Sequence, residues 1–231
     1  PLRALVAANT RRGLAVSRAV NLGVGTFDPV DGARDAKRCS QVQLLAFLVV
    51  VDELGSFFFP SPLSAYMSGI LLNVPPPSSL EKVTGSKIDC VFQDPVFTQP
   101  DRDFLVGLGH RVVEDPVACA MVDAETLLFG VHLYRPVYAA ALEKSLPAIF
   151  VGTGWDVWDE LSRTDCLEKM EVMEKTYKKC AFPQDSHGSA FSSTSIYWKP
   201  VPEVENKAAE TGDSLVVDGE VSRKLESKSI S

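Results

Sequence analysis

The chain has 231 residues, 45% of them hydrophobic and 23% charged, which is enough for one sizeable core but short for two. Its net charge of −7 argues against a dedicated nucleic-acid-binding protein, because such proteins normally present a basic surface. Five widely spaced cysteines without a C-x-x-C pair argue against a disulfide framework and a structural zinc module. We therefore expect a protein of the cytoplasm, the nucleus or both, with no nucleic-acid or membrane partner.

The N-terminal residues 1–19 carry four arginines and no acidic residue. An Arg-rich, acid-poor stretch of this kind is typical of a mitochondrial transit peptide, but a solvated basic arm or a piece of helix has the same composition. We treat it as a basic arm ahead of a domain that spans residues 20–200.

The middle of the chain alternates short apolar runs with helical patterns. The apolar runs predict strands at residues 19–22, 88–92, 110–114, 126–129 and 148–151, with a last edge strand at 193–198. Ser40 and Gln43 fit a capping box, which predicts a buried helix over 42–54. Further helices are expected at 100–108, from Pro136 to Leu142, at 155–161, and at 166–180, where Leu167, Met170, Met173 and Tyr177 form one stripe.

Two segments stand apart from this alternation. Residues 55–87 form an atypical insertion, in which prolines, a glycine and serines interrupt the apolar part too often for a membrane span. A mobile flap, a hydrophobic loop for a partner and a segment foreign to the domain all remain open. Residues 201–231 lack aromatic residues and carry seven acidic and four basic side chains, which predicts a disordered acidic tail.

Strands that alternate with helices indicate an α/β fold, here a three-layer sandwich with a mostly parallel, Rossmann-like sheet and helices on both faces. Ligands of such sheets bind beyond the carboxyl ends of the strands. The residues expected there are Gly23 and Gly25 after the first strand, Asp94 after the second, His132 after the fourth, and Gly152 and Gly154 after the fifth.

These residue types suit a nucleotide or adenosyl pocket. Glycines let the backbone approach a ligand closely, and an acid at the end of the second strand binds ribose hydroxyls. Each residue also has a structural interpretation. The glycine pairs fit ordinary turns, Asp94 fits a turn in which its carboxylate caps the amides of Phe97 or Thr98, and His132 fits a hydrogen-bonded rim position. No catalytic constellation is complete, and a Ser-His-Asp set around His187 lacks a nucleophile elbow.

Several strings, in order, resemble the Sensitivity to Red Light Reduced (SRR-like) domain family. They are residues 41–44 (QVQL), 90–97 (CVFQDPVF), 101–105 (DRDFL), Leu108-Gly109, 126–129 (TLLF) with His132, and Gly152 with Gly154. The strings at 182–187 (FPQDSH) and 191–198 (FSSTSIYW) are similar to fungal members in particular. Two positions depart from the family pattern, since Leu133 replaces a cysteine and residues 153–154 lack the asparagine of the last strand end.

The resemblance implies a regulatory protein, since family members are linked to circadian timing, light signalling, microtubule-drug sensitivity and haem metabolism. We therefore expect a non-enzymatic regulator that binds a protein partner or a small nucleotide-like ligand at the strand-end crevice. One alternative is a transferase with an adenosyl or nucleotide cofactor held by Gly23, Gly25 and Asp94. Another is a haem or metal sensor that uses His132 or His187 with a cysteine.

Overall fold

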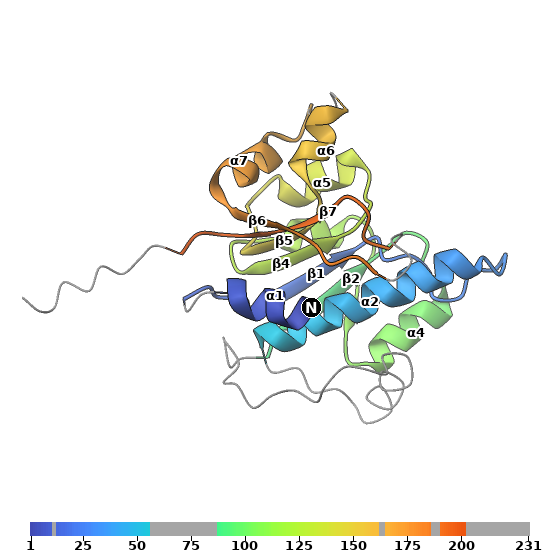
Figure 1. Ribbon diagram of the computed structural model, residues 1–231. Helices are drawn as coiled ribbons and strands as arrows, with labels where there is room; N and C mark the ends of the chain where they lie inside the picture. Colours follow the sequence, from blue (N-terminus) through green and yellow to red (C-terminus); the bar gives the residue numbers. More distant parts are fainter. Residues whose placement is uncertain (11–12, 56–86, 162–164, 186–189, 202–231) are drawn as a thin grey trace, which may run out of the picture. The chain divides into compact units, whose positions relative to one another are not determined.

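A seven-stranded sheet forms the centre of the computed structural model, which describes residues 1–10, 13–55, 87–161, 165–185 and 190–201 (Figure 1). The strand order is β3-β2-β1-β4-β5-β7-β6. The first five strands along the chain are parallel, and β7 is antiparallel to both β5 and β6. The strands are β1 (Arg18–Leu22), β2 (Asp89–Gln93), β3 (Arg111–Val112), β4 (Thr126–Gly130), β5 (Ile149–Thr153), β6 (Lys178–Ala181) and β7 (Thr194–Trp198).

Helices cover both faces of this sheet, and the predicted α/β fold with a mostly parallel sheet is confirmed (Figure 1). One face carries α1 (Leu2–Asn9), α2 (Arg34–Leu54) and α4 (Gln99–Gly107). The other carries the 3-10 helix η1 (Val117–Met121), α5 (Arg135–Leu142), α6 (Trp155–Glu160) and α7 (Glu168–Thr176). None of the described helices is both long and apolar enough to cross a membrane.

Helix α2 begins earlier than the capping box predicts. It starts at Arg34, and Ser40 lies inside it, where the Ser40 hydroxyl donates to the carbonyl oxygen of Ala36 at 3.1 Å. The prediction was wrong because the preceding turn consists largely of good helix formers, so the helix continues past a cap-like pattern. The apolar part of α2 packs on the sheet as expected, with the ring of Phe47 at 5.1 Å from that of Phe92 and 5.6 Å from that of Phe129.

The N-terminal residues pack on the domain. Val6 of α1 is fully buried, and the guanidinium of Arg3 donates to Asp52 at 2.7 Å and lies 3.3 Å from Glu53, both near the end of α2. Of the interpretations left open for residues 1–19, the structure therefore shows a piece of helix at 2–9. The domain accordingly includes residues before 20, because an apolar helix face finds a partner in α2.

The C-terminal part of the sheet differs most from the prediction. The helix expected at 166–180 ends at Thr176, and β6 follows it directly. Strand β7 is also not the edge, because β6 pairs with it on the outer side. Local pattern favours a longer helix, but tertiary pairing outweighs it. Apart from the residues at their ends, the predicted insertion at 55–87 and the acidic tail at 201–231 lie outside the described residues.

Helix α4 starts with a reciprocal cap. The Asp101 carboxylate accepts from the amide and the hydroxyl of Thr98, both at 2.9 Å, and from the amide of Phe27, also at 2.9 Å. Burial acts to raise the pKa of Asp101, but the hydrogen bonds from Thr98 and Phe27 outweigh it, and the pKa is lowered below its usual 3.8. The ionised form is therefore the one that the folded state stabilises.

Replacing Asp101 by asparagine is expected to cost about 2 kcal/mol of unfolding free energy at pH 7, because hydrogen bonds to a charged acceptor are lost. The wild-type chain loses this contribution as the pH falls from the unfolded-state value towards the lower folded-state pKa, so the difference between the two proteins narrows below pH 3.8. Urea unfolding at pH 7 and pH 3 measures this. Asp103→Asn, on the exposed side of the same helix, is the control, and a constant difference at both pH values would contradict the assignment.

Candidate functional site

The carboxyl ends of β1 and β4 lie side by side at a topological switch point. The chain runs from β1 to β2 and β3 on one side and from β4 to β5 on the other, so the two crossover directions diverge between β1 and β4. Open α/β sheets bind their ligands at such a point. Gly23 directly follows β1, and Gly130 is the last residue of β4.

Gly23, Gly25 and Asp94 come together as the sequence predicts. Both glycines have positive φ angles, +69° and +81°, which an L side chain rarely adopts. The Gly23 amide donates to the carbonyl oxygen of Gln93 at 3.0 Å, and the Gly25 amide donates to Oδ2 of Asp94 at 2.7 Å. This loop therefore joins the ends of β1 and β2.

The Asp94 carboxylate is buried and binds backbone amides on both oxygens. Oδ1 accepts from the amide of Val96 at 2.9 Å, while Oδ2 accepts from Gly25. Asp94 therefore caps backbone amides as expected, but these are the amides of Gly25 and Val96 and not those of Phe97 or Thr98. Phe97 donates to the main-chain oxygen of Asp94, and Thr98 donates to Asp101.

His132 lies exposed directly beyond β4, with its backbone in the left-handed region (φ 58°). Its Nε2 is 2.9 Å from the carbonyl oxygen of Ser192 and 3.1 Å from the Ser192 hydroxyl. A carbonyl oxygen only accepts, so Nε2 is the donor in the contact with the Ser192 carbonyl oxygen. His132 is therefore a hydrogen-bonded residue at the rim, which is one of the two interpretations given above. Its partner, Ser192, was not predicted from the sequence.

Leu133 fills the switch point. A Cβ added to Gly23 would lie 2.2 Å from Cδ2 of Leu133, and one added to Gly130 would lie 2.4 Å from its Cδ1. The two glycines thus form a seat for one leucine side chain, which we call the Leu133 seat. The sequence did not predict this contact.

Gly152 and Gly154 lie in and directly after β5, away from the switch point between β1 and β4. Gly152 lies inside β5 opposite Gly130, and Tyr138 occupies the space next to it. The Tyr138 hydroxyl donates to the carbonyl oxygen of Gly130 at 2.6 Å and accepts from the amide of Thr153 at 3.0 Å. Gly154 is the N-cap of α6.

The surroundings of Gly154 are charged. Lys179 of β6 contacts Asp156 at 2.5 Å and Glu174 at 3.0 Å, and the Tyr197 hydroxyl donates to Glu174 at 2.6 Å. Burial opposes the charge of Lys179, but its hydrogen bonds to Asp156 and Glu174 prevail and raise its pKa. The sequence missed this cluster because it assigned Lys179 to a helix.

A family model described as the SRR1 domain matches residues 2–198. The chain belongs to the SRR1 domain family. This confirms the family that the motifs predicted. A search of the curated proteins found no match.

One buried residue of the SRR1 domain that sequence reasoning missed is Gln93, at the end of β2. Its Nε2 donates to Oδ1 of Asp115 at 2.8 Å, and its Oε1 accepts from the amide of Ala118 at 2.6 Å. It thereby fixes the chain between β3 and η1 against the central sheet. A polar residue at the end of the apolar run Cys90-Val91-Phe92 is the signal that could have identified it.

The residues that the structure describes contain no group of three or more His, Cys, Asp or Glu that could hold a metal ion. Burial raises the pKa of Cys90 to about 12, so this thiol stays protonated in the SRR1 domain. His187 lies outside the described residues. Haem or metal binding through His132 or His187 with a cysteine therefore stays a prediction.

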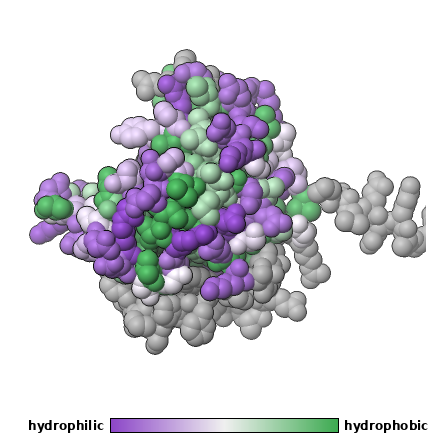
Figure 2. Space-filling view, turned by 180° about the vertical axis from the view of Figure 1, so that it is seen from behind, coloured by the Kyte–Doolittle hydropathy of each residue, from purple (hydrophilic) through white to green (hydrophobic). Residues whose placement is uncertain are grey.

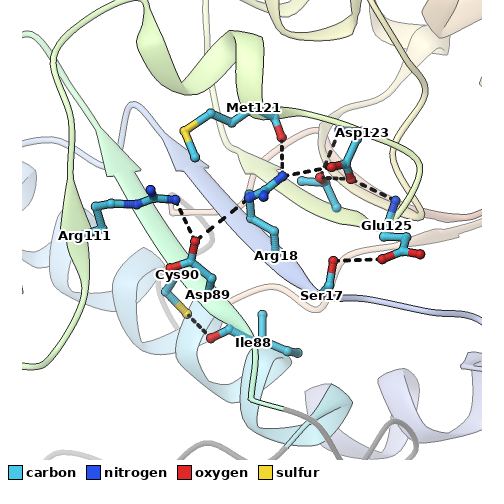
Figure 3. A network of polar contacts seen from close by, with 10 residues as sticks. Ser17, Arg18, Ile88, Asp89, Cys90, Arg111, Met121, Asp123 and Glu125 are labelled. Atoms are coloured by element: carbon cyan, nitrogen blue, oxygen red, sulfur yellow. Dashed lines mark hydrogen bonds and ion pairs between the residues drawn. The ribbon is translucent and has the colours of Figure 1, made fainter.

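The amino-terminal edge of the sheet is polar and paired (Figure 3). Arg18 of β1 donates to Asp123 at 2.8 Å and to the carbonyl oxygen of Met121 at 3.0 Å, and Arg111 of β3 donates to Asp89 of β2 at 2.6 Å. Arg18 Nε also lies 4.0 Å from Asp89, so these contacts connect the starts of β1, β2 and β3 with the turn before β4. Each contributes modestly because it is partly exposed.

Proposed function

We propose that this SRR1 domain protein is a non-enzymatic regulator that binds a protein partner with the carboxyl edge of its sheet. The carboxyl edge is defined here as the loops that follow β1, β2, β3 and β4. The proposal covers the circadian or signalling type of role and the fungal type of chain that the motifs suggest, and a cytoplasmic or nuclear location.

The supporting observation is the distribution of exposed large apolar side chains. The loops after β1, β2 and β4 present Val30, Val96 and Tyr134, exposed by 99%, 55% and 82%. Val117, exposed by 50%, follows the loop after β3 as the first residue of η1. The carboxyl ends of parallel strands meet at one edge, so these four belong to the same end of the sheet. Apolar and aromatic side chains grouped on loops are typical of a protein interface.

The opposite edge offers a contrast. Leu14, Val16, Ile88 and Val122, which precede the parallel strands, are all buried, and the charged side chains there pair with one another (Figure 3). Seen from behind, the molecule carries apolar residues gathered in a patch amid polar ones (Figure 2). Exposed large apolar side chains follow β1, β2, β3 and β4, whereas the apolar residues that precede β1, β2 and β4 are buried, which favours the carboxyl edge as the partner surface.

The transferase alternative draws less support from the geometry. It requires that Gly23, Gly25 and Asp94 contact a cofactor, yet the Asp94 carboxylate binds the amides of Gly25 and Val96, and Leu133 fills the switch point. The adenosyl or nucleotide cofactor stays a prediction. Stoichiometric turnover of a small substrate by the purified chain would contradict a non-enzymatic role.

Site-specific photo-crosslinking in the native cells tests the proposed surface. A benzophenone amino acid at position 134 is expected to capture a discrete partner protein, and the same group at exposed position 172 on α7 is the control. Adding Val96→Ser and Val117→Ser is expected to lower the yield at position 134 by on the order of tenfold, equivalent to about 1.4 kcal/mol. Equal capture at both positions, or an unchanged yield in the double variant, would contradict the proposal.

A further inference from the structure

We infer that the outer face of helix α5 is the interface of a homodimer, in which two copies of this chain pack their α5 helices antiparallel. This goes beyond the proposed partner surface, because α5 follows the loops that define the carboxyl edge and is not part of them. The occupant of this face is a second copy of the same chain.

The outer face of α5 is apolar, which is the first observation. Residues 136–142 include no charged side chain. The buried side of the helix consists of Tyr138, Ala141 and Leu142. The outward positions are taken by exposed Pro136, half-buried Val137 and exposed Ala140. A helix that is apolar on every side is normally covered on every side, and the domain covers only one side of α5.

The neighbouring elements set α5 apart from the rest of its layer. The 3-10 helix η1 packs beside α5 and continues the apolar surface with exposed Ala120 and half-buried Met121. Helices α6 and α7 lie on the same side of the sheet, yet their exposed positions carry charged side chains, such as Asp159 in α6 and Glu168 and Lys169 in α7. Within this layer, the uncharged outer surface therefore belongs to α5 and η1.

The charges at the ends of α5 are the second observation. Arg135 is the first residue of the helix and Glu143 is its C-cap, whereas the helix dipole favours an acid at the start and a base at the end. Arg135 contacts Asp165. Lys144 has the sign that the dipole favours, but Glu143 does not, and Glu143 is exposed and forms no ion pair with the described residues. Glu143 is therefore the charge at these ends that lacks a complement.

An antiparallel pair of α5 helices supplies that complement. When the two helices cross near Ala140, Glu143 of one copy lies at the helix N-terminus of the other copy, where the dipole favours an anion, and close to its Arg135. The same contact forms twice, as the two-fold symmetry of a homodimer requires. Because α5 has only eight residues, the interface is small, and we expect a dimer that dissociates on dilution.

Sedimentation of the full chain over a range of concentrations tests the interface. The wild-type chain is expected to show a monomer–dimer equilibrium, and Ala140→Glu is expected to raise the dissociation constant on the order of tenfold or more, because it buries an unpaired carboxylate in the apolar face. Ala36→Glu, at an exposed alanine of α2 on the opposite side of the sheet, is expected to dimerise like the wild type. A wild-type chain that is monomeric at the highest soluble concentration would overturn the dimer. An unchanged dissociation constant in Ala140→Glu would overturn the assignment of α5.

A charge exchange tests the antiparallel arrangement separately. Glu143→Arg is expected to weaken the dimer several-fold, because the new guanidinium would face Arg135 of the other copy, and adding Arg135→Glu is expected to recover most of the loss. Glu168→Arg, at an exposed acid of α7, is the control and is expected to leave the dissociation constant unchanged. A double variant that dimerises no better than Glu143→Arg would overturn the antiparallel arrangement. Capture of a different protein at position 134 is independent of these results, so the two proposals fail separately.

Discussion

Replacing Gly152 by alanine is expected to lower the free energy of unfolding by about 3 kcal/mol, the upper end of what overpacking a core usually costs. A Cβ at this position would lie 2.7 Å from the carbonyl oxygen of Gly130, 2.7 Å from Cζ of Phe150 and 3.0 Å from the hydroxyl of Tyr138. The first of these is a backbone atom in the adjacent strand, which cannot move without disturbing the ladder between β4 and β5. Urea denaturation at pH 7 measures the change.

Gly107→Ala is the matched control, because nothing lies within 4 Å of a Cβ added there and the residue ends helix α4. Its stability is expected to equal or slightly exceed that of the wild type, since alanine favours a helix over glycine by up to about 1 kcal/mol. A loss of less than about 1 kcal/mol in Gly152→Ala would show that β4 and β5 relax around the added methyl group, and that Tyr138 is not held as the distances indicate.

Acidification from pH 7 to pH 4 is expected to destabilise the domain through His110 by up to about 3 kcal/mol. This histidine is 6% exposed, and its ring centroid lies 5.2 Å from that of Phe92. Burial lowers its pKa from 6.5 to about 4, because the charged imidazolium loses its hydration. The unfolded chain therefore binds a proton at a pH where the folded chain does not, so stability is full above pH 6.5 and falls as the pH approaches 4.

His110→Gln, which stays neutral throughout, is expected to lose this dependence. The difference in unfolding free energy between variant and wild type, measured from pH 7.5 to pH 4, isolates the histidine from the carboxylates that titrate in both proteins. His132→Gln keeps His110 and is expected to retain the fall in stability towards pH 4. If the unfolding free energies of His110→Gln and the wild type depend on pH in the same way, the pKa of His110 is the same in the folded and unfolded chains, which would contradict the prediction.

The strands of the parallel sheet were predictable from sequence. Strands buried on both faces are short continuous apolar runs, as in Leu127, Leu128 and Phe129, and this pattern does not depend on what lies far away in the chain. Residues 178–181 show the opposite case. Lys178 and Lys179 continue the charged pattern of α7, and only their pairing with Trp198 and Tyr197 of β7 makes them a strand.

In the candidate site, too, some features were predictable from the sequence and others were not. The proximity of Gly23, Gly25 and Asp94 was predictable from the sequence, because the carboxyl ends of parallel strands share one edge of a sheet. Their contacts were not predictable: backbone amides bind the Asp94 carboxylate, and Leu133 fills the switch point. Local periodicity gives the positions of the strands, whereas the packing of Leu133 against Gly23 depends on residues more than a hundred positions apart in the chain.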